Sequence, residues 1–293
     1  MRIALAGATG FTGKRMLDLL LERGHSVTCL VRAESRTESL AGRGLDVVVG
    51  DLEDAGAIAA ALDGHDAFAS AGPLTPDIAR AVVAAARDAR LHRVLVIGST
   101  SIFTTLSAKS KARKTEAEDV VRQSGLRYTV LRPTMIYGTH EDRNMCRLVQ
   151  YVSTHRFVPI FGTGEFLQQP VYVQDLARAA VLALESPTSV GKAYDVAGGN
   201  ALSYNEVIDT TARLLGRRVT RVHIPLRLSL FLVRLYWRIA PNPRLHGEQI
   251  LRLNEDKAFS TEEIERDLGY TALTFEEGMT REVAEIREWE GSH

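Results

Sequence analysis

Short apolar runs alternate with longer amphipathic stretches over the first half of the chain. The runs are "RIALAG", "SVTCLV", "LDVVVGD", "DAFASAG", "RVLVIGS" and "RYTVLRP", and stretches of helical periodicity such as "KRMLDLLLERG" lie between most of them. Continuous apolar runs are typical of strands buried on both faces, and the intervening helices imply right-handed βαβ crossovers. The pattern therefore predicts an α/β fold with a doubly wound parallel sheet.

The alternation loosens after "RYTVLRP", returns once at "PVYVQDLARAAVLALE" and then gives way to mixed helix and strand signals. We expect residues 1–133 plus 170–186 to form the doubly wound domain. Residues 134–169 plus 187–293 are expected to form a smaller, mixed lobe that covers a cleft at the edge of the sheet. The sequence shows no internal repeat and no low-complexity segment.

The segment "LRLSLFLVRLYWRIA" predicts an amphipathic helix in the lobe. At 100° per residue, Arg227, Arg234 and Arg238 lie within about 40° of one another, opposite a broad apolar face. Such a helix can lie on a membrane surface through residues 227–240, or it can cover the substrate cleft. We favour the cleft, because no other part of this neutral chain indicates a membrane.

Composition narrows the functional classes. The 293 residues are 45% hydrophobic, which is enough for a large core, and 36 basic residues balance 36 acidic ones, which indicates no nucleic acid partner. Cys29 and Cys146 are the only cysteines, which suits a reducing compartment better than a disulfide framework. We identify no leader sequence and no apolar run of the ~20 residues that a membrane span needs. We expect a cytoplasmic protein. The absence of His or Cys pairs at ligand spacing predicts no metal.

The first strand leads into "GATGFTGKRMLDLL", which places three glycines where a strand turns into a helix. Glycines at this spacing permit a tight turn, let the backbone approach a pyrophosphate and bring the helix close to the strand. The free N–H groups of the helix N-terminus then bind the anion. The motif predicts a dinucleotide site, with a merely tight turn as the alternative. The expected phosphate contacts are Gly7, Thr9, Gly10, Phe11 and Thr12.

The residue after the second strand predicts which dinucleotide is bound. Arg32 stands where a carboxylate would bind the ribose 2′-hydroxyl of NAD, and a guanidinium there can pair with a 2′-phosphate, assisted by Arg36. We therefore expect NADP(H), with NAD(H) less favoured; solvated loop arginines are the alternative. Asp51 is expected either at the adenine amino group or as the cap of the next helix. Leu52 and Ala71 are also in the expected cofactor set.

Several motifs, taken in order, resemble one family. "GATGFTG", "VVVGDL", "SGLRYTVLRPTMIYG" and "PVYVQDLARAA" resemble the extended and atypical short-chain dehydrogenase/reductases, including the epimerase/dehydratase-like and NmrA-like proteins. "YGTHEDRNM", "FLQQPVYVQDLA" and "RDLGYTALTFEEGM" are similar to the atypical branch that contains the nucleotide-binding accessory subunit of respiratory complex I. The resemblance covers nearly the whole chain. It implies a sheet of about seven strands, with the nicotinamide at its carboxyl edge facing the lobe.

The resemblance also implies roles for individual residues. The active-site Ser or Thr that follows the fifth strand corresponds to Thr100, with Ser99 and Ser101 beside it. The family lysine, which holds the nicotinamide ribose and lies four residues before a glutamate on the same helical face, corresponds to Lys114. Pro133 corresponds to the proline whose following backbone groups border the nicotinamide, and it belongs to the expected cofactor set.

The family tyrosine, expected four residues before Lys114, is replaced by Ser110. A serine hydroxyl has a far higher pKa than a phenol and cannot simply replace a tyrosinate as general base near neutral pH. Three interpretations stay open: Tyr137 acts as the acid, the substrate needs no proton from the protein, or NADPH is bound without turnover. A reductase should have a pocket over the nicotinamide lined by Thr100, Ser110, Pro133 and Tyr137.

The expected substrate is a small organic molecule. Family members that act on nucleotide sugars have an asparagine and an arginine where this chain has Pro133 and Gln168, so a diphosphate lacks its bidentate partner. Residues 140–143 lie by the predicted cleft and either contact substrate or form a solvated loop. We predict an NADP(H)-dependent oxidoreductase, with a catalytically silent NADPH-binding accessory protein and a sugar-nucleotide epimerase or dehydratase as alternatives. The helices expected over 75–90 and 107–124 allow a monomer or a homodimer.

Overall fold

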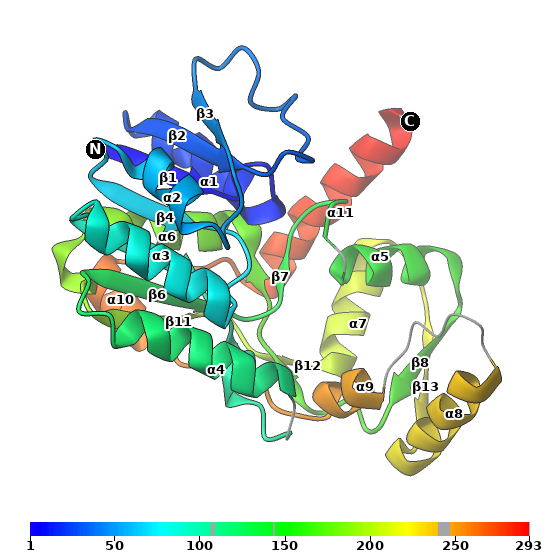
Figure 1. Ribbon diagram of the computed structural model, residues 1–293. Helices are drawn as coiled ribbons and strands as arrows, with labels where there is room; N and C mark the ends of the chain where they lie inside the picture. The colour runs from blue at the N-terminus through cyan, green and yellow to red at the C-terminus, as the bar shows by residue number, and fades with distance from the viewer. Residues whose placement is uncertain (107–108, 143, 240–246, 293) are drawn as a thin grey trace.

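The computed structural model of the protein describes residues 1–106, 109–142, 144–239 and 247–292. Its centre is a seven-stranded sheet of order β11-β6-β5-β4-β1-β2-β3, and every pairing in this sheet is parallel (Figure 1). The strands are β1 (Arg2–Ala6), β2 (Ser26–Val31), β3 (Asp46–Val49), β4 (Ala67–Ser70), β5 (Arg93–Ile97), β6 (Tyr128–Pro133) and β11 (Lys192–Val196). The prediction of a doubly wound parallel sheet of about seven strands is confirmed.

Helices cover both faces of the sheet, because successive residues of a strand point to opposite sides. In β1, Ile3 and Leu5 pack in the core under α1 and α6, whereas Ala4 and Ala6 pack in the core under α2, α3 and α4. The bounds of these helices are α1 (Phe11–Glu22), α6 (Val173–Glu185), α2 (Ala55–Leu62), α3 (Pro76–Asp88) and α4 (Lys109–Arg122). With both faces covered, the carboxyl edge of the sheet is where a ligand can approach.

Most of the remaining elements form the lobe or connect it to the sheet, whereas η2 and α10 pack against α6 beside the edge of the sheet (Figure 1). Three short strand pairs, β10-β7, β12-β9 and β13-β8, join segments that are far apart in the sequence. Buried side chains of α5, α7 and α11 form a separate core there. The elements are η1 (Thr100–Phe103), β7 (Ile136–Tyr137), α5 (Met145–Thr154), β8 (Phe157–Phe161), β9 (Leu167–Gln168), β10 (Val171–Tyr172), η2 (Pro187–Ser189), β12 (Leu202–Ser203), α7 (Tyr204–Leu214), β13 (Thr220–Ile224), α8 (Leu226–Ile239), α9 (Gly247–Leu253), α10 (Glu262–Leu268) and α11 (Phe275–Ser292).

Strand β11 belongs to the seven-stranded sheet although it lies within the range 187–293 that we expected in the lobe. It pairs in parallel with β6 at the edge of the sheet. Its sequence, "KAYDV", places Lys192 and Asp195 among apolar residues, because an edge strand is less covered, so it lacks the continuous apolar signal of the other strands. The sheet therefore extends beyond the expected ranges, while the division of the chain into two domains stays a prediction.

Helix α8 does not cover the ligand-binding edge of the sheet. It lies at the end of the lobe farthest from the sheet (Figure 1), and Ser229 and Val233 are its buried residues. Our preference for a helix that covers the substrate cleft is therefore wrong, because periodicity shows that a helix has two faces but not which neighbour covers either one. Among the described helices, none is long and apolar enough to cross a membrane.

Helix α11 buries a glutamate in the core of the lobe. Glu282 has no exposed surface, and as a carboxylate it finds no hydrogen-bond donor in the described part of the chain. Burial, the hydrogen bond that its protonated form makes with Asp142, and the negative charges of Asp142 and Glu285 raise its pKa from 4.5 to about 10. Glu282 is therefore neutral in the folded protein at neutral pH.

We expect Glu282→Gln to raise the free energy of unfolding at pH 7 by roughly 2 to 3 kcal/mol, because the glutamate must take up a proton to fold and glutamine need not. The folded pKa of Glu282 exceeds the unfolded value, so its contribution to stability is complete below pH 4.5 and is lost as the pH rises towards 10. Urea unfolding should show that the substitution increases the free energy of unfolding only slightly at pH 4.5 and strongly at about pH 8. Glu22→Gln, at an exposed position of α1, is the control. An equal gain at both pH values would contradict a neutral Glu282.

Candidate cofactor and active site

The glycine turn between β1 and α1 is closed by contacts that a side chain would prevent. A Cβ on Gly13 would lie 1.9 Å from the carbonyl oxygen of Gly7, so α1 packs directly against the turn. Gly7 has a positive φ of 80°, and a Cβ there would lie 3.0 Å from the amide nitrogen of Gly72. The Gly10 N–H completes the turn by donating to the Gly7 carbonyl oxygen at 2.9 Å. The conformation therefore requires the glycines that the sequence provides.

Helix α1 begins with its N-terminus open to a ligand. Its N-cap is Gly10, which has no side chain to cap it, and its first turn has no acidic residue. The first N–H groups of a helix lack intrahelical partners and form the positive end of the helix dipole, so they favour an anion. Phe11 and Thr12 supply such groups, and Thr9 lies in the turn before them. The turn fits a dinucleotide pyrophosphate; the individual phosphate contacts stay a prediction.

The residues expected at the adenosine end of the cofactor lie on the surface. Arg32 follows β2 directly, its side chain is 65% exposed, and its guanidinium forms an ion pair with Glu34 at 3.2 Å. Asp51 is also exposed, and its Oδ1 accepts a hydrogen bond from the Glu53 N–H at 2.8 Å. The cap of α2 is Asp54, not Asp51, since the Asp54 side chain accepts from two N–H groups of the first turn. Asp51 therefore does not cap α2. Its carboxylate either binds the adenine amino group, as expected, or only stabilises the turn that it forms with Glu53.

A cavity of about 720 Å³ opens where β4, β5 and β6 end. The carboxyl ends of neighbouring parallel strands meet at one edge, which is where open α/β sheets bind ligands. Residues that follow these strands line the cavity together with one face of α4. The lining includes Ala71, Gly72, Ser99, Ser110, Arg113, Lys114, Pro133 and Thr134. The structure thus brings together four of the expected residues: Ala71, Ser110, Lys114 and Pro133. Leu52 lies beside them, its Cδ1 2.8 Å from where a Cβ on Gly72 would be.

Lys114 has a polar partner in this cavity but no acidic one. Its Nζ donates to Ser101 Oγ at 2.8 Å. Burial, and then the positive charge of Arg252, lower the pKa of Lys114. Glu118, expected beside it, accepts hydrogen bonds from the Arg132 guanidinium instead, at 2.9 Å for Nε. Among the described residues Lys114 therefore has no carboxylate partner, and its charge is available to a ligand.

The three hydroxyl residues after β5 have different partners. Thr100 Oγ1 donates to the Pro133 carbonyl oxygen at 3.1 Å. Ser99 lines the cavity, and its hydroxyl donates to Ser101 Oγ at 3.0 Å. Ser101 also accepts from Lys114, so it is the residue that fixes the lysine. The 3₁₀ turn η1 begins here and directs successive side chains differently, which the sequence alone could not reveal.

Tyr137 does not lie in the cavity, contrary to our expectation for a replacement acid. Its side chain is fully buried between the rings of Tyr172 and Phe275, and its hydroxyl donates to the Phe275 carbonyl oxygen at 3.4 Å. Burial raises its pKa well above the ordinary value of 10.0. The parallel pairing of β7 with β10 directs this ring into the core of the lobe. The role of an active-site acid is therefore not retained for Tyr137.

The polar cluster at 140–143 is engaged within the protein wherever the structure describes it. His140 Nδ1 bonds with Glu285 at 2.7 Å, and Glu141 pairs with Lys14 at 2.7 Å. Asp142 accepts from N–H groups at the start of α5. Arg143 lies outside the described residues. These contacts favour the structural interpretation of this loop. No group of His, Cys, Asp or Glu in the described segments is arranged to hold a metal ion.

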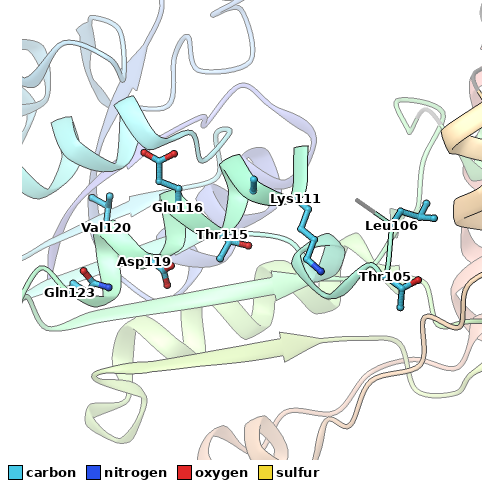
Figure 2. A pocket seen from close by; sticks show the side chains of 9 residues that line it. Thr105, Leu106, Lys111, Thr115, Glu116, Asp119, Val120 and Gln123 are labelled. Carbon is cyan, nitrogen blue, oxygen red and sulfur yellow. The ribbon is translucent and has the colours of Figure 1, made fainter. Parts of the chain in front are cut away.

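A second hollow runs along the outer side of α4. Figure 2 shows Lys111, Thr115, Asp119 and other side chains that line it. Its volume of about 780 Å³ slightly exceeds that of the cavity. It is nonetheless a shallow surface feature, and none of the expected cofactor or catalytic residues lines it. We therefore assign the candidate site to the cavity at the sheet edge, which adjoins the glycine turn through Gly72.

A model of an NAD(P)H-binding protein family matches residues 7–187, more than half of the chain. The chain belongs to this NAD(P)H-binding family. The match begins at the glycine turn and ends just after α6, so it spans both the turn and the cavity. The resemblance to the atypical short-chain dehydrogenase/reductases is confirmed, and the chain is an NAD(P)-binding member of that oxidoreductase group.

Similar proteins include both reductases and accessory subunits. The 4-hydroxy-2-methyl-3-oxo-4-farnesyl-3,4-dihydroquinoline-1-oxide ketoreductase of Stigmatella aurantiaca is 26% identical over 95% of both chains. The 2-alkyl-3-oxoalkanoate reductase of Stenotrophomonas maltophilia is 25% identical over 96% of this chain and 98% of its own. Mitochondrial NADH dehydrogenase [ubiquinone] 1 alpha subcomplex subunit 9 of Dictyostelium discoideum is 26% identical over 94% of this chain and 82% of its own.

Solved structures agree in fold. A nucleoside-diphosphate-sugar epimerase from Pseudomonas aeruginosa superposes with a TM-score of 0.79 at 18% identity, and the match covers 98% of each chain. The UDP-glucose 4-epimerase of Thermotoga maritima superposes with a TM-score of 0.75 at 18% identity, over 99% of this chain and 100% of its own. At such low identity these similarities establish the shared fold and nothing about the reaction.

We expect Gly13→Ala to weaken NADPH binding at least tenfold and to destabilise the protein by about 1 to 3 kcal/mol. The added methyl carbon would stand 1.9 Å from the Gly7 carbonyl oxygen, so α1 must move away from the turn. Fluorescence titration with NADPH and urea unfolding measure the two effects. Gly291→Ala in α11 is the control, since a Cβ there meets nothing within 4 Å. Wild-type affinity in the Gly13 variant would show that the turn does not bind the cofactor.

Proposed function

We propose that the protein is an NADPH-dependent reductase that acts on a carbonyl or another activated carbon of a small organic substrate. The observation on which this rests is the lysine in the cavity: Lys114 is held by Ser101 at 2.8 Å, lacks a carboxylate partner among the described residues, and faces a space of about 720 Å³. A pocket of this size with a few polar groups suits a small ligand. The names of two relatives, a ketoreductase and an oxoalkanoate reductase, support the carbonyl class.

The residues of the cavity suggest how the reaction proceeds. NADPH, when bound, supplies the hydride. Lys114 would bind the hydroxyls of the nicotinamide ribose, and its charge would stabilise the negative charge that develops on the substrate oxygen. Burial lowers the pKa of Lys114, which makes its ammonium a better proton donor than an exposed lysine. We expect Lys114 to protonate that oxygen through the Ser110 hydroxyl and to regain its proton from water, so that no tyrosine is needed.

The preference for NADPH rests on Arg32. This arginine stands directly after β2, where a carboxylate would otherwise select the ribose 2′-hydroxyl of NAD. Arg32 forms an ion pair with the exposed Glu34, and an exposed ion pair of this kind contributes little, so the guanidinium can turn to a 2′-phosphate at small cost. Arg36 is exposed in the same loop and can assist.

A catalytically silent NADPH-binding protein is the second candidate. Ser110 stands in the place of the catalytic tyrosine, and Tyr137 is buried away from the cavity. Relatives also include a photosystem II assembly factor of Synechocystis, 23% identical over 86% of this chain. The sugar-nucleotide alternative draws no support from Gln168, which is buried and accepts a hydrogen bond from Lys257 Nζ at 3.2 Å.

Arg32→Ala should weaken NADPH binding by about 1 to 3 kcal/mol, because a charged hydrogen-bonded pair with the 2′-phosphate is lost. NADH, which lacks that phosphate, should bind the variant and the wild type equally. Calorimetry with both cofactors measures this. Arg213→Ala is the control, since Arg213 is also an exposed arginine and pairs with Glu276 in the lobe. Tighter binding of NADH than of NADPH by the wild type would overturn the preference.

Lys114→Met should lower the rate of NADPH oxidation about 10²- to 10⁴-fold, the usual range for loss of an acid–base group. NADPH affinity should fall much less, because the phosphate turn is untouched. The assay follows NADPH absorbance with a panel of ketones and enones. Lys111→Met, three residues earlier on α4 with its Nζ bonded to the Thr104 carbonyl, is the control. If the NADPH absorbance stays constant when the wild type is incubated with every compound of the panel, the reductase proposal is wrong and the protein is a catalytically silent NADPH-binding protein.

A further inference from the structure

Helix α8 turns a row of large apolar side chains away from the rest of the protein. The α8 apolar row consists of Leu228, Phe231, Leu232, Leu235 and Ile239, and all five are exposed, from 43% for Leu235 to 73% for Ile239. Their spacing of three and four residues places them on one side of the helix. Soluble monomers rarely expose contiguous apolar patches of this kind, so the row indicates an interaction surface.

The other side of α8 is held against the protein over the first half of the helix. Ser229 and Val233 are buried there, and on a helical wheel Val233 lies about 150° from the middle of the apolar row. The Ser229 hydroxyl donates to the Ile224 carbonyl oxygen at 3.1 Å, and the Ser229 N–H donates to the Pro225 carbonyl oxygen at 2.9 Å. These contacts set the rotation of the helix, so the apolar row faces outwards as part of the fold.

A row of arginines borders the apolar row. Arg227, Arg234 and Arg238 lie about 90° from the middle of the apolar row, along one of its edges, and all three are exposed. Helix α8 contains no acidic residue. The nearby Arg221 of β13 pairs with Asp209 at 3.0 Å, whereas none of the three arginines of α8 pairs with a carboxylate among the residues that the structure describes. The surface therefore combines an apolar face with an uncompensated positive edge.

We propose that α8 docks the protein on the surface of an anionic lipid bilayer. The helix has 14 residues, which corresponds to a length of about 21 Å, and it is too short to cross a membrane. Lying in the plane of the interface, it inserts the apolar row at the boundary of headgroups and acyl chains. The long arginine side chains then reach back to the lipid phosphates. Both the apolar face and its charged edge find a partner in this arrangement.

A second copy of the chain fits this surface less well. A symmetric contact through the apolar row with antiparallel helices would place the arginine row of one copy beside that of the other, and a contact with parallel helices would offer the arginines no acidic residue of α8. The like charges would oppose the contact that the apolar side chains favour. A bilayer that contains anionic lipid has the opposite charge at the depth where the arginines lie.

Flotation with vesicles tests this proposal on the full-length protein. Vesicles of phosphatidylcholine with phosphatidylglycerol should bind the wild type, vesicles of phosphatidylcholine alone should bind it far less, and added salt should release it. The triple variant R227Q/R234Q/R238Q keeps the apolar row and should bind roughly a hundredfold more weakly. The variant F231E/L235E should not bind at all, because the row can no longer enter the bilayer.

Val47→Glu is the matched control, since Val47 is a 43% exposed apolar residue on β3, outside the lobe, and this substitution should leave vesicle binding unchanged. All variants should retain wild-type NADPH affinity, which shows that they are folded. The proposal is overturned if the wild type does not float with anionic vesicles, or if the α8 variants float as well as the wild type. A dimer in light scattering that F231E/L235E dissolves, without vesicle binding, would assign the row to a second copy. None of these readouts depends on reductase activity.

Discussion

The close approach of α1 to the turn after β1 is the constraint on which the rest of the site depends. Because there is room for only a hydrogen between Gly13 and the Gly7 carbonyl oxygen, the first turn of α1 is pressed against the edge of the sheet. Gly7 in turn lies against Gly72 at the end of β4, and Ala71 beside it already lines the cavity. The same contacts thus position the phosphate turn and the cavity, which favours a rigid, preorganised cofactor site.

Much of the fold could be predicted from the sequence because its signals are local. A strand such as "VLVI" is buried on both faces, so its apolar run is continuous, and the helices between such strands leave one parallel arrangement. Strand β11 could not be recognised in this way. It is an edge strand whose Asp195 reaches Arg132 of β6 at 3.5 Å, and the chain returns to β6 only after α6. That pairing depends on contacts between distant segments, which local patterning does not encode.

In the candidate site, too, the residues fixed by local structure could be predicted, whereas those fixed by contacts between distant segments could not. Lys114, Ser110 and Pro133 reach the cavity as expected because the ends of strands and the face of the following helix fix where they lie. Tyr137 could not be placed, since its direction is set by pairing with Tyr172 on another segment. The partner of Lys114 was equally hidden: Glu118 has the right helical spacing, but Arg132 takes it and Ser101 holds the lysine. For helix α8 the sequence likewise predicts an apolar and a basic face, but not which part of the protein lies against the helix.

Lys114, which has no carboxylate partner in the described part of the chain, distinguishes the two functions that the fold allows. A protein that only binds NADPH needs the phosphate turn, Arg32 and a hydrogen-bond donor to the ribose hydroxyls, and because those hydroxyls are neutral the donor need not be a cation. Lys114 is partly desolvated, which lowers its pKa, and holding a desolvated ammonium without a carboxylate is unfavourable for the protein alone. Such a group is stabilised when negative charge develops beside it, as on the oxygen of a carbonyl that accepts hydride. The destabilised lysine is thus more than cofactor binding requires, and it is what a reductase without a catalytic tyrosine needs.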